Sequence, residues 1–351
     1  MIKRNETRKI KVGNVQIGHQ DKVVIQTMTT SKTHAIDKVV HEINQYATMG
    51  AEIVRLAVLD MEDAEAIKTI KSLTTVPLVA DIHFDYRLAL KAIENGIDKI
   101  RINPGNIGDE KRIKMVVDAC KKRQIPIRIG VNAGSLEKDL LKEYGKSAYA
   151  MIKSAERHVK LLENLDFYDI VLSLKASDAA LSTEAYLEAA KRFPYPLHLG
   201  VTEAGSLHQG VIASGAALGE LLRKGIGDTI RISLSAPRSE EIKACKTLLT
   251  TYGLYDAPRV ISCPTCGRLS YDMHKILTQV EAYLEDKPVP LTVAVMGCAV
   301  NGPGEAKEAD IGIAGGVNEG LIFLKGKIVK KVPQAELFDT FKTMLDELIN
   351  D

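Results

Sequence analysis

The stretch Ile53-Val-Arg-Leu-Ala-Val58 is a short apolar run rich in β-branched residues, and Pro77-Leu-Val-Ala-Asp-Ile82 and Lys99-Ile-Arg-Ile-Asn103 are two more such runs. Between the first two lies Ala64-Glu-Ala-Ile-Lys-Thr-Ile-Lys-Ser-Leu73, in which apolar residues recur at i, i+3 and i+4. The short runs are typical of buried strands, and the longer segment is typical of an amphipathic helix. Strands that alternate with helices pair in parallel through right-handed crossovers. The stretch therefore predicts a parallel α/β fold.

The same alternation extends on both sides of this stretch. Eight strand candidates occur: Val23–Met28, Ile53–Val58, Pro77–Ile82, Lys99–Asn103, Pro126–Val131, Asp169–Lys175, Pro196–Val201 and Thr229–Leu234. Eight strand–helix units over about 250 residues match a (β/α)8 barrel. A doubly wound open sheet is the alternative, but it usually has a glycine-rich turn after its first strand. Here Thr29-Thr-Ser-Lys-Thr-His34 follows the first strand without a glycine, which favours the barrel.

A smaller region with a different pattern follows the barrel. We expect a helix at Ser239–Thr251, strands at Pro290–Gly297 and Asp310–Ala314, a hairpin at Leu321–Val329 and a closing helix at Gln334–Leu348. The chain is therefore predicted to be an α/β protein with a TIM-barrel domain over residues 1–250 and a small α+β domain over residues 258–351. An extra helix is expected around Leu136–Tyr144.

The composition excludes several classes of function. The 351 residues include 47 Lys and Arg against 45 Asp and Glu, so a net charge of +2 gives no general attraction to nucleic acid or membranes. No apolar run approaches the ~20 residues of a membrane span, and no secretory signal is recognisable. Five cysteines are too few for a disulfide scaffold, and Cys120 and Cys245 lie in helical patterns as expected for inert buried thiols. We therefore expect a reduced, cytoplasmic globular protein.

Polar residues recur along one side of the predicted strands. Their spacing of two places them on one face of each strand, and the opposite face is apolar as expected for contact with helices. The polar face must then point into the barrel. It comprises Arg55, Asp81, His83, Arg101, Asn103, Arg128, Asn132, Lys175, Ser177, His198, Thr202, Arg231 and Ser233.

The charges on this face do not balance. Four arginines and one lysine stand against one aspartate, and buried charges need partners. Arginine side chains suit phosphate oxygens. We therefore predict a multiply anionic ligand at the C-terminal ends of the strands, where the active sites of barrels lie. A set of purely structural ion pairs is the alternative.

Three cysteines gather in the C-terminal region. Cys263-Pro-Thr-Cys266 is a C-x-x-C pair, and Cys298 lies in Met296-Gly-Cys-Ala-Val-Asn-Gly-Pro-Gly-Glu305. Three thiolates from two turns rich in Gly and Pro favour an iron–sulfur cube, in which one iron has no cysteine ligand. A zinc site, with His274 as the candidate fourth ligand, and a redox dithiol are the alternatives.

Several longer motifs resemble those of one enzyme family. They are Val79-Ala-Asp-Ile-His-Phe-Asp-Tyr86, Arg101-Ile-Asn-Pro-Gly-Asn-Ile-Gly108, Arg128-Ile-Gly-Val-Asn-Ala-Gly-Ser-Leu-Glu-Lys138, Leu197-His-Leu-Gly-Val-Thr-Glu-Ala-Gly205, Cys263-Pro-Thr-Cys266 and Gly297-Cys-Ala-Val-Asn-Gly-Pro-Gly-Glu-Ala306. From about Gln26 to Gly316 the chain resembles the bacterial 4-hydroxy-3-methylbut-2-enyl diphosphate synthases of the non-mevalonate isoprenoid pathway. It departs from them at Pro237-Arg-Ser-Glu-Glu241, where the family usually has Asp-Pro-Val-Glu-Glu.

The resemblance implies a reductive enzyme. Its substrate would be 2-C-methyl-D-erythritol 2,4-cyclodiphosphate, opened and dehydroxylated to (E)-4-hydroxy-3-methylbut-2-enyl diphosphate with two electrons from reduced flavodoxin or ferredoxin. The implied cofactor is a [4Fe-4S] cluster in a C-terminal domain that resembles modules of sulfite and nitrite reductases. Its ligands map to Cys263, Cys266, Cys298 and an exchangeable Glu305. A homodimer is also implied, in which the cluster domain of one chain covers the barrel mouth of the other.

The resemblance and the charges together assign roles. Diphosphate binding is expected of Arg55, Arg101, Arg128, Lys175 and Arg231, with hydrogen bonds from Asn103, Asn132 and Ser233. Asp81 is expected to orient an arginine or a substrate hydroxyl, and Glu203 to donate a proton to the departing oxygen. The alternative function is a non-redox barrel that binds a phosphorylated ligand and is stabilised by a structural zinc ion.

Overall fold

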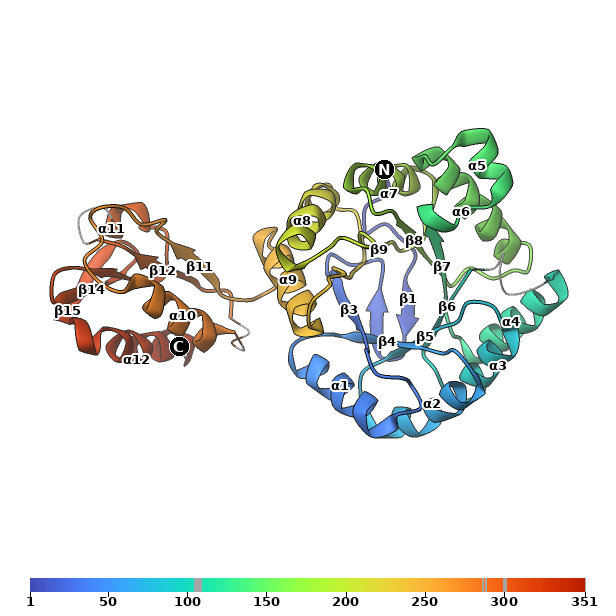
Figure 1. Cartoon of the computed structure of the whole chain (residues 1–351), viewed down its shortest axis with the longest axis horizontal. Coiled ribbons are helices and arrows are strands. Elements are labelled where there is room, and N and C mark those ends of the chain that lie inside the picture. The colour runs from blue at the N-terminus through green and yellow to red at the C-terminus, as the bar shows by residue number, and fades with distance from the viewer. Residues whose placement is uncertain (104–108, 286, 288, 299–301, 351) are drawn as a thin grey trace. The chain divides into compact units, whose positions relative to one another are not determined.

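The computed structural model describes residues 1–103, 109–285, 287, 289–298 and 302–350, with only the backbone of residues 303 and 305. By its contacts the chain divides into two compact units, Met1–Leu254 and Tyr255–Asp351 (Figure 1). No helix in the described part of the chain is long and apolar enough to cross a membrane.

The first unit is a barrel of eight parallel strands. They are β3 (Val24–Met28), β4 (Ile53–Ala57), β5 (Leu78–Asp81), β6 (Lys99–Ile102), β7 (Ile127–Asn132), β8 (Ile170–Lys175), β9 (His198–Leu199) and β10 (Thr229–Ile230). The sheet runs β8-β7-β6-β5-β4-β3-β10-β9, and a parallel bridge between Leu172 and Leu197 brings its two ends together. Figure 1 shows the strands forming a ring inside the helices. The predicted (β/α)8 fold is confirmed.

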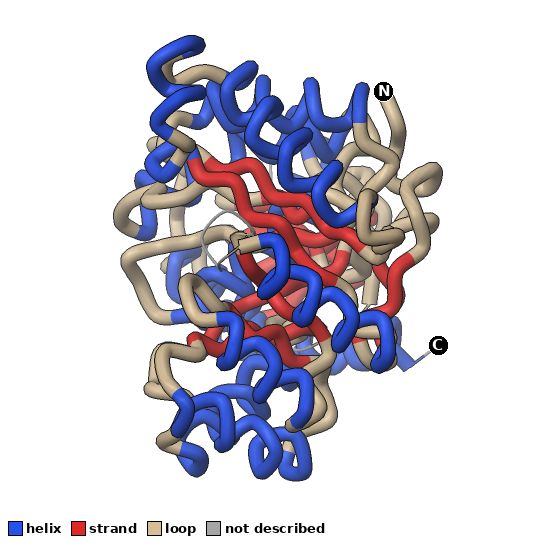
Figure 2. Tube along the Cα trace, turned by 90° about the vertical axis from the view of Figure 1, so that its right-hand side faces the viewer, coloured by secondary structure: helices blue, strands red, loops and turns tan. Residues whose placement is uncertain are grey.

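Helices cover the outside of the barrel (Figure 2). They are α1 (Ile36–Thr48), α2 (Met61–Leu73), α3 (Tyr86–Glu94), α4 (Glu110–Arg123), α6 (Ala148–Glu163), α7 (Ala179–Arg192), α8 (Leu207–Arg223) and α9 (Arg238–Thr251). Several begin at a side-chain cap; for example, Asp109 accepts a hydrogen bond from the Arg112 N–H, which fixes the start of α4. The extra helix predicted around Leu136–Tyr144 is α5 (Lys138–Tyr144), which follows a short 3-10 turn, η2 (Ala133–Ser135).

An N-terminal hairpin closes one end of the barrel. Strands β1 (Ile10–Val12) and β2 (Val15–Ile17) pair antiparallel. Their apolar side chains pack on residues near the N-terminal ends of four barrel strands: Val24, Ile53, Val79 and Val171. The hairpin was not predicted from the sequence. Because it fills the N-terminal end with apolar groups, polar interior groups can meet a ligand only toward the C-terminal ends of the strands.

The second unit is a mixed five-stranded sheet with helices. Its strands are β11 (Arg259–Ser262), β12 (Thr292–Met296), β13 (Ile311–Gly315), β14 (Glu319–Leu324) and β15 (Lys327–Pro333), in that order. The first three strands are parallel, and the last two are added as antiparallel neighbours. Helices α10 (Met273–Leu284) and α12 (Leu337–Asn350) contribute to its core, while α11 (Gly302–Glu305) and η3 (Gln334–Glu336) are short.

Candidate active site in the barrel and the cysteine loops

Three of the predicted residues form one ion-pair cluster on β4, β5 and β6. Asp81 Oδ2 lies 3.3 Å from Arg55 Nη2, and its Oδ1 lies 3.2 Å from Arg101 Nη1. Arg101 Nη1 also lies 2.7 Å from His83 Nε2, which can accept its hydrogen bond. Burial alone would raise the pKa of Asp81, but the two guanidiniums hold it below its ordinary value. Asp81 is therefore an ionised counter-charge that orients two arginines.

Arg231 is held by a carboxylate that the sequence analysis missed. It directly follows β10, and its Nε lies 3.3 Å from Oε2 of Glu241 on α9. The buried Glu241 also accepts the Leu234 N–H at 2.9 Å and pairs with Arg238, which stands in the stretch that departs from the family pattern. The sequence did contain a signal that Glu241 is buried, because Glu241 lies on the apolar face of its helix.

Arg128 and Lys175 have no such counter-charge among the described residues. Arg128 is 1% exposed, and its Nε and Nη1 make no hydrogen bond in the described part of the chain. Burial and the positive charges of Arg128 and Arg231 hold the pKa of Lys175 well below its ordinary value. A guanidinium buried without a partner, as Arg128 is, is costly, so its presence indicates an anionic ligand.

Two glycines make room for the long cationic side chains. A Cβ on Gly130 in β7 would lie 2.7 Å from Arg101 Nε on the neighbouring strand. A Cβ on Gly200, just after β9, would lie 2.5 Å from Lys175 Nζ. A larger residue in place of either glycine would therefore displace the Arg101 or Lys175 side chain, because each of these side chains lies against the backbone of the glycine.

The remaining predicted polar residues lie at the C-terminal ends of the strands. Asn132 ends β7, and its Oδ1 accepts the Gly134 N–H at 2.9 Å. Asn103 directly follows β6 and Ser233 lies three residues after β10; both are half-buried. Glu203 is exposed and has a φ of +54°, in the left-handed region that non-glycine residues rarely adopt. Backbone strain of this kind is common at functional sites.

A deeper layer of buried polar groups lies beside the arginines. Lys99 Nζ lies 3.4 Å from Gln26 Oε1, and His198 Nδ1 lies 2.7 Å from Thr229 Oγ1. The other ring nitrogen of His198 and the amide nitrogen of Gln26 make no hydrogen bond within the described residues. The sequence analysis missed Lys99, although it lies two residues before Arg101 and so shares its strand face.

The three C-terminal cysteines lie at the ends of two adjacent parallel strands. Cys263 directly follows β11 and donates its N–H to the Val295 carbonyl of β12 at 3.0 Å. Cys298 follows β12 by two residues, and Cys266 is exposed. A Cβ on Gly297 would lie 3.3 Å from Cys263 Sγ. The glycine therefore lets this sulfur lie against the backbone next to Cys298.

Three thiols at two adjacent turns match the cysteine count of an iron–sulfur cube with one non-cysteine ligand. Each thiolate of such a cube binds a separate iron. Thr265, inside the C-x-x-C turn, has a φ of +64°, which is rare for a β-branched residue. The side chain of Glu305, the expected fourth ligand, lies outside the described residues.

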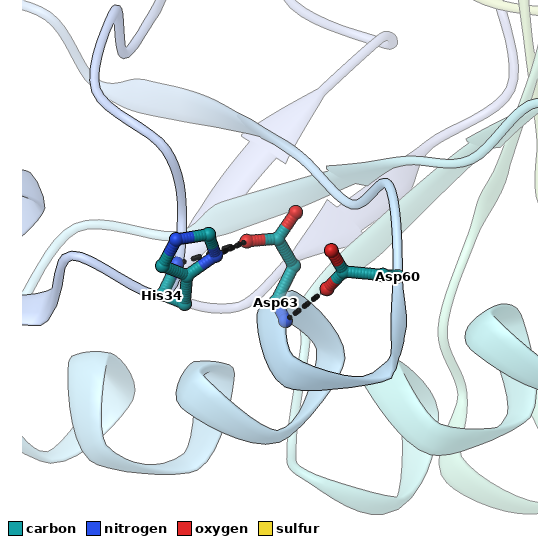
Figure 3. Close-up of side chains that lie close together, drawn as sticks. All are labelled: His34, Asp60 and Asp63. Carbon is teal, nitrogen blue, oxygen red and sulfur yellow. Dashed lines mark hydrogen bonds and ion pairs between the residues drawn. The ribbon is translucent and has the colours of Figure 1, made fainter.

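A histidine and two aspartates meet where the loops after β3 and β4 approach each other (Figure 3). Asp63 Oδ1 accepts hydrogen bonds from the His34 N–H and Nδ1, both at 2.9 Å, and its Oδ2 accepts the Leu59 N–H at 3.0 Å. Asp60 caps α2 by accepting the Asp63 N–H. Both oxygens of Asp63 are thus used to join the two loops, so the group has a structural role.

Comparisons with known proteins cover nearly the whole chain. The family model described as the GcpE TIM-barrel domain matches residues 7–246, and the GcpE protein C-terminal domain matches residues 259–347. The 4-hydroxy-3-methylbut-2-en-1-yl diphosphate synthase (flavodoxin) of Bacillus cereus (strain B4264) is 55% identical over 348 residues, 99% of this chain and 94% of the relative. The protein of the same name from Shouchella clausii (strain KSM-K16) is 54% identical over 352 residues, 100% of this chain and 96% of the relative.

A solved structure supports the fold alone. The dihydropteroate synthase of Yersinia pestis has a TM-score of 0.51 at 12% identity, covering 70% of this chain and 98% of that chain. The resemblance inferred from the sequence motifs is confirmed by the curated relatives and the family models. The chain therefore belongs to the GcpE family, that of the 4-hydroxy-3-methylbut-2-en-1-yl diphosphate synthases, and is an oxidoreductase.

Proposed function

We propose that the chain opens and dehydroxylates 2-C-methyl-D-erythritol 2,4-cyclodiphosphate to give (E)-4-hydroxy-3-methylbut-2-enyl diphosphate. One observation supports this most strongly: the barrel interior holds more cations than carboxylates. Within the described residues, only Asp81 and Glu241 pair with its arginines, and Arg128 and Lys175 form no ion pair. The two phosphates of a cyclic diphosphate would supply the missing negative charge.

The interior cations would also favour the product side of the reaction. Two electrons and one proton are taken up, one oxygen leaves as water, and the other broken C–O bond leaves its oxygen on the diphosphate. The diphosphate thereby gains one negative charge. Groups that bind this developing charge more strongly than the original substrate lower the barrier. Arg128 and Lys175 suit this role because no carboxylate among the described residues pairs with either side chain.

Other residues would position the substrate and supply the proton. Asp81 holds Arg55 and Arg101 in place, so these two guanidiniums are already oriented before a phosphate arrives. Hydrogen bonds from Asn103, Asn132 and Ser233 would complete the phosphate site. Glu203, beyond the end of β9, is proposed to donate the proton to the departing oxygen.

We propose that a [4Fe-4S] cluster is held by Cys263, Cys266, Cys298 and Glu305. The position of these cysteines just after the adjacent strands β11 and β12 and the glycine beside Cys263 support this ligand set. When bound, such a cluster supplies electrons to the substrate one at a time. Glu305 would be the exchangeable ligand, because a carboxylate binds iron less firmly than a thiolate does. Cys120 and Cys245 are unsuited as ligands, since burial raises the pKa of both thiols.

The reaction also needs a protein that delivers the two electrons. The names of the relatives include flavodoxin, so reduced flavodoxin or ferredoxin is the proposed donor. The working unit is proposed to be a homodimer. The proposed location is the cytoplasm, where cysteine ligands are kept reduced.

Metal analysis and ligand binding would separate this proposal from a zinc-stabilised, non-redox barrel. Anaerobically purified protein should contain about four iron ions and about four acid-labile sulfide ions per chain and should bind the cyclic diphosphate. Cys298→Ser should lose most of the iron, whereas Cys120→Ser, a matched change at a buried helical cysteine, should keep it. One zinc ion per chain without sulfide would contradict the proposal.

A further inference from the structure

Lys99 is a buried lysine that the proposed reaction does not yet use. It is the first residue of β6, and its side chain is 0% exposed. Its Nζ lies 3.4 Å from the neutral amide oxygen of Gln26 on β3. Strands β3 and β6 are separated by β4 and β5, so this contact crosses the barrel interior. No carboxylate among the described residues pairs with Lys99.

Positive groups surround this lysine from the other strands. Arg55 on β4 and Arg128 on β7 are the charges that act on it most, and Lys99 in turn acts on His198 of β9. The charged and titratable groups around the barrel interior are Arg55, Asp81, His83, Arg101, Arg128, Lys175, Tyr186, His198, Arg231 and Glu241. Both carboxylates are already paired with arginines. Burial and the guanidiniums of Arg128 and Arg55 hold the pKa of Lys99 well below its ordinary value.

We infer that Lys99 is a neutral amine in the ligand-free barrel and takes up a proton when a cyclic diphosphate enters, becoming part of the counter-charge to the phosphates. This inference rests on the proposed function. The physical reason is that nearby anions in a poorly solvated interior favour the charged form of an amine. The anion would offset the repulsion from Arg55 and Arg128, which opposes protonation in the free protein. Lys99 would thus be a basic group that gains its proton when phosphate binds. It lies deeper in the barrel than the arginines that bind the ligand.

Proton uptake must make binding depend on pH. Each phosphorus of the cyclic diphosphate carries one strongly acidic oxygen, so the ligand itself exchanges no proton near neutral pH. Any proton taken up on binding therefore goes to the protein. For each proton taken up, affinity should fall about tenfold as the pH rises by one unit, within the range between the pKa of Lys99 without ligand and its pKa with ligand.

Calorimetric titration of the cluster-containing full chain would count these protons. The cyclic diphosphate would be added without reductant, so that no turnover occurs, in two buffers of different ionisation enthalpy. We expect Lys99→Met and Lys99→Gln to take up between about half a proton and one proton fewer than the parent. Their affinity should also vary less with pH. Lys114→Met, which removes an exposed lysine of α4, should match the parent.

The outcomes distinguish this inference from the proposed function. Replacing a buried amine that has no carboxylate partner by a methionine of similar length should leave the fold intact; Lys99→Gln supplies a polar replacement if Lys99→Met does not fold. Equal proton counts in the parent and a folded Lys99 variant would overturn the inference and leave the proposed function standing. Failure of the cyclic diphosphate to bind the parent would overturn the proposed function itself.

Discussion

Replacing Arg128 by methionine should separate the stability of the barrel from its capacity to bind a ligand. Arg128 is among the largest fully buried side chains of the described residues, and neither Nε nor Nη1 has a partner there. Its neighbours Arg55 and Arg101 repel it, whereas Asp81 and, more weakly, Tyr186 attract it. The side chain thus costs free energy in the ligand-free protein. We expect a phosphate to offset this cost.

The expected magnitudes have opposite signs. Exchange of a buried, uncompensated charge for an apolar side chain of similar length should leave the free energy of unfolding unchanged or raise it by about 1–4 kcal/mol. Loss of a charge-assisted contact should weaken binding of the cyclic diphosphate by about 1.5–3 kcal/mol. This corresponds to a dissociation constant roughly 10 to 150 times larger.

Denaturant unfolding and calorimetric binding would measure both effects on the same protein. Arg192→Met is the matched control, because Arg192 lies on the surface of α7 and pairs with Glu156 at 2.9 Å. Its loss should change stability by less than about 1 kcal/mol and leave binding unchanged. If Arg128→Met bound the cyclic diphosphate as tightly as the parent, the assignment of the barrel interior to phosphate binding would be refuted. A loss of more than about 3 kcal/mol of stability would show that Arg128 has an internal partner.

Three further predictions concern other parts of the chain. Burial raises the pKa of Asp228 to about 7, above the ordinary value of about 3.9 expected on unfolding, so stability should fall as the pH rises through this range. Asp228→Asn should remove this loss of stability at higher pH. Melting temperatures of the parent and the variant, measured below and above neutral pH, would test it. A parent melting temperature that does not change with pH would contradict the prediction. Glu305→Cys should bind the cluster more firmly and block turnover, and full activity with an intact cluster would rule out an exchangeable Glu305. Mixing Cys298→Ser chains with Arg128→Ala chains should restore some turnover in verified heterodimers, whereas no recovery would indicate that each chain works alone.

The sequence predicted the existence of the barrel strands better than the lengths of β9 and β10 or the hairpin that closes one end of the barrel. The apolar runs located all eight strands, but β9 and β10 are only two residues long, against the predicted Pro196–Val201 and Thr229–Leu234. Strand β9 ends just before Gly200, where a Cβ would lie 2.5 Å from Lys175 Nζ. The N-terminal hairpin escaped prediction because β1 and β2 have three residues each, too few to show a period. Packing on the barrel, rather than local propensity, stabilises such short strands.

The alternation within strands indicated which charges share a face, but it could not identify their counter-charges. It grouped Arg55, Asp81 and Arg101, which the structure joins in one cluster. It missed Glu241, because a glutamate on a helix usually faces solvent and this one is turned inward by the apolar stripe of α9. Arg128 has no partner among the described residues. This depends on which residues distant in the sequence come near it, so no spacing rule reveals it.

The most direct measurement is an anaerobic turnover assay with the cyclic diphosphate, a chemical reductant and the cluster-containing protein. Product would be identified by mass spectrometry, and reductant consumption would be followed by absorbance. The account predicts 4-hydroxy-3-methylbut-2-enyl diphosphate with two electrons consumed per molecule, and loss of most turnover in both Arg101→Ala and Cys298→Ser. Absence of product from protein with a full complement of iron and sulfide would contradict the account, as would turnover unaffected by either substitution.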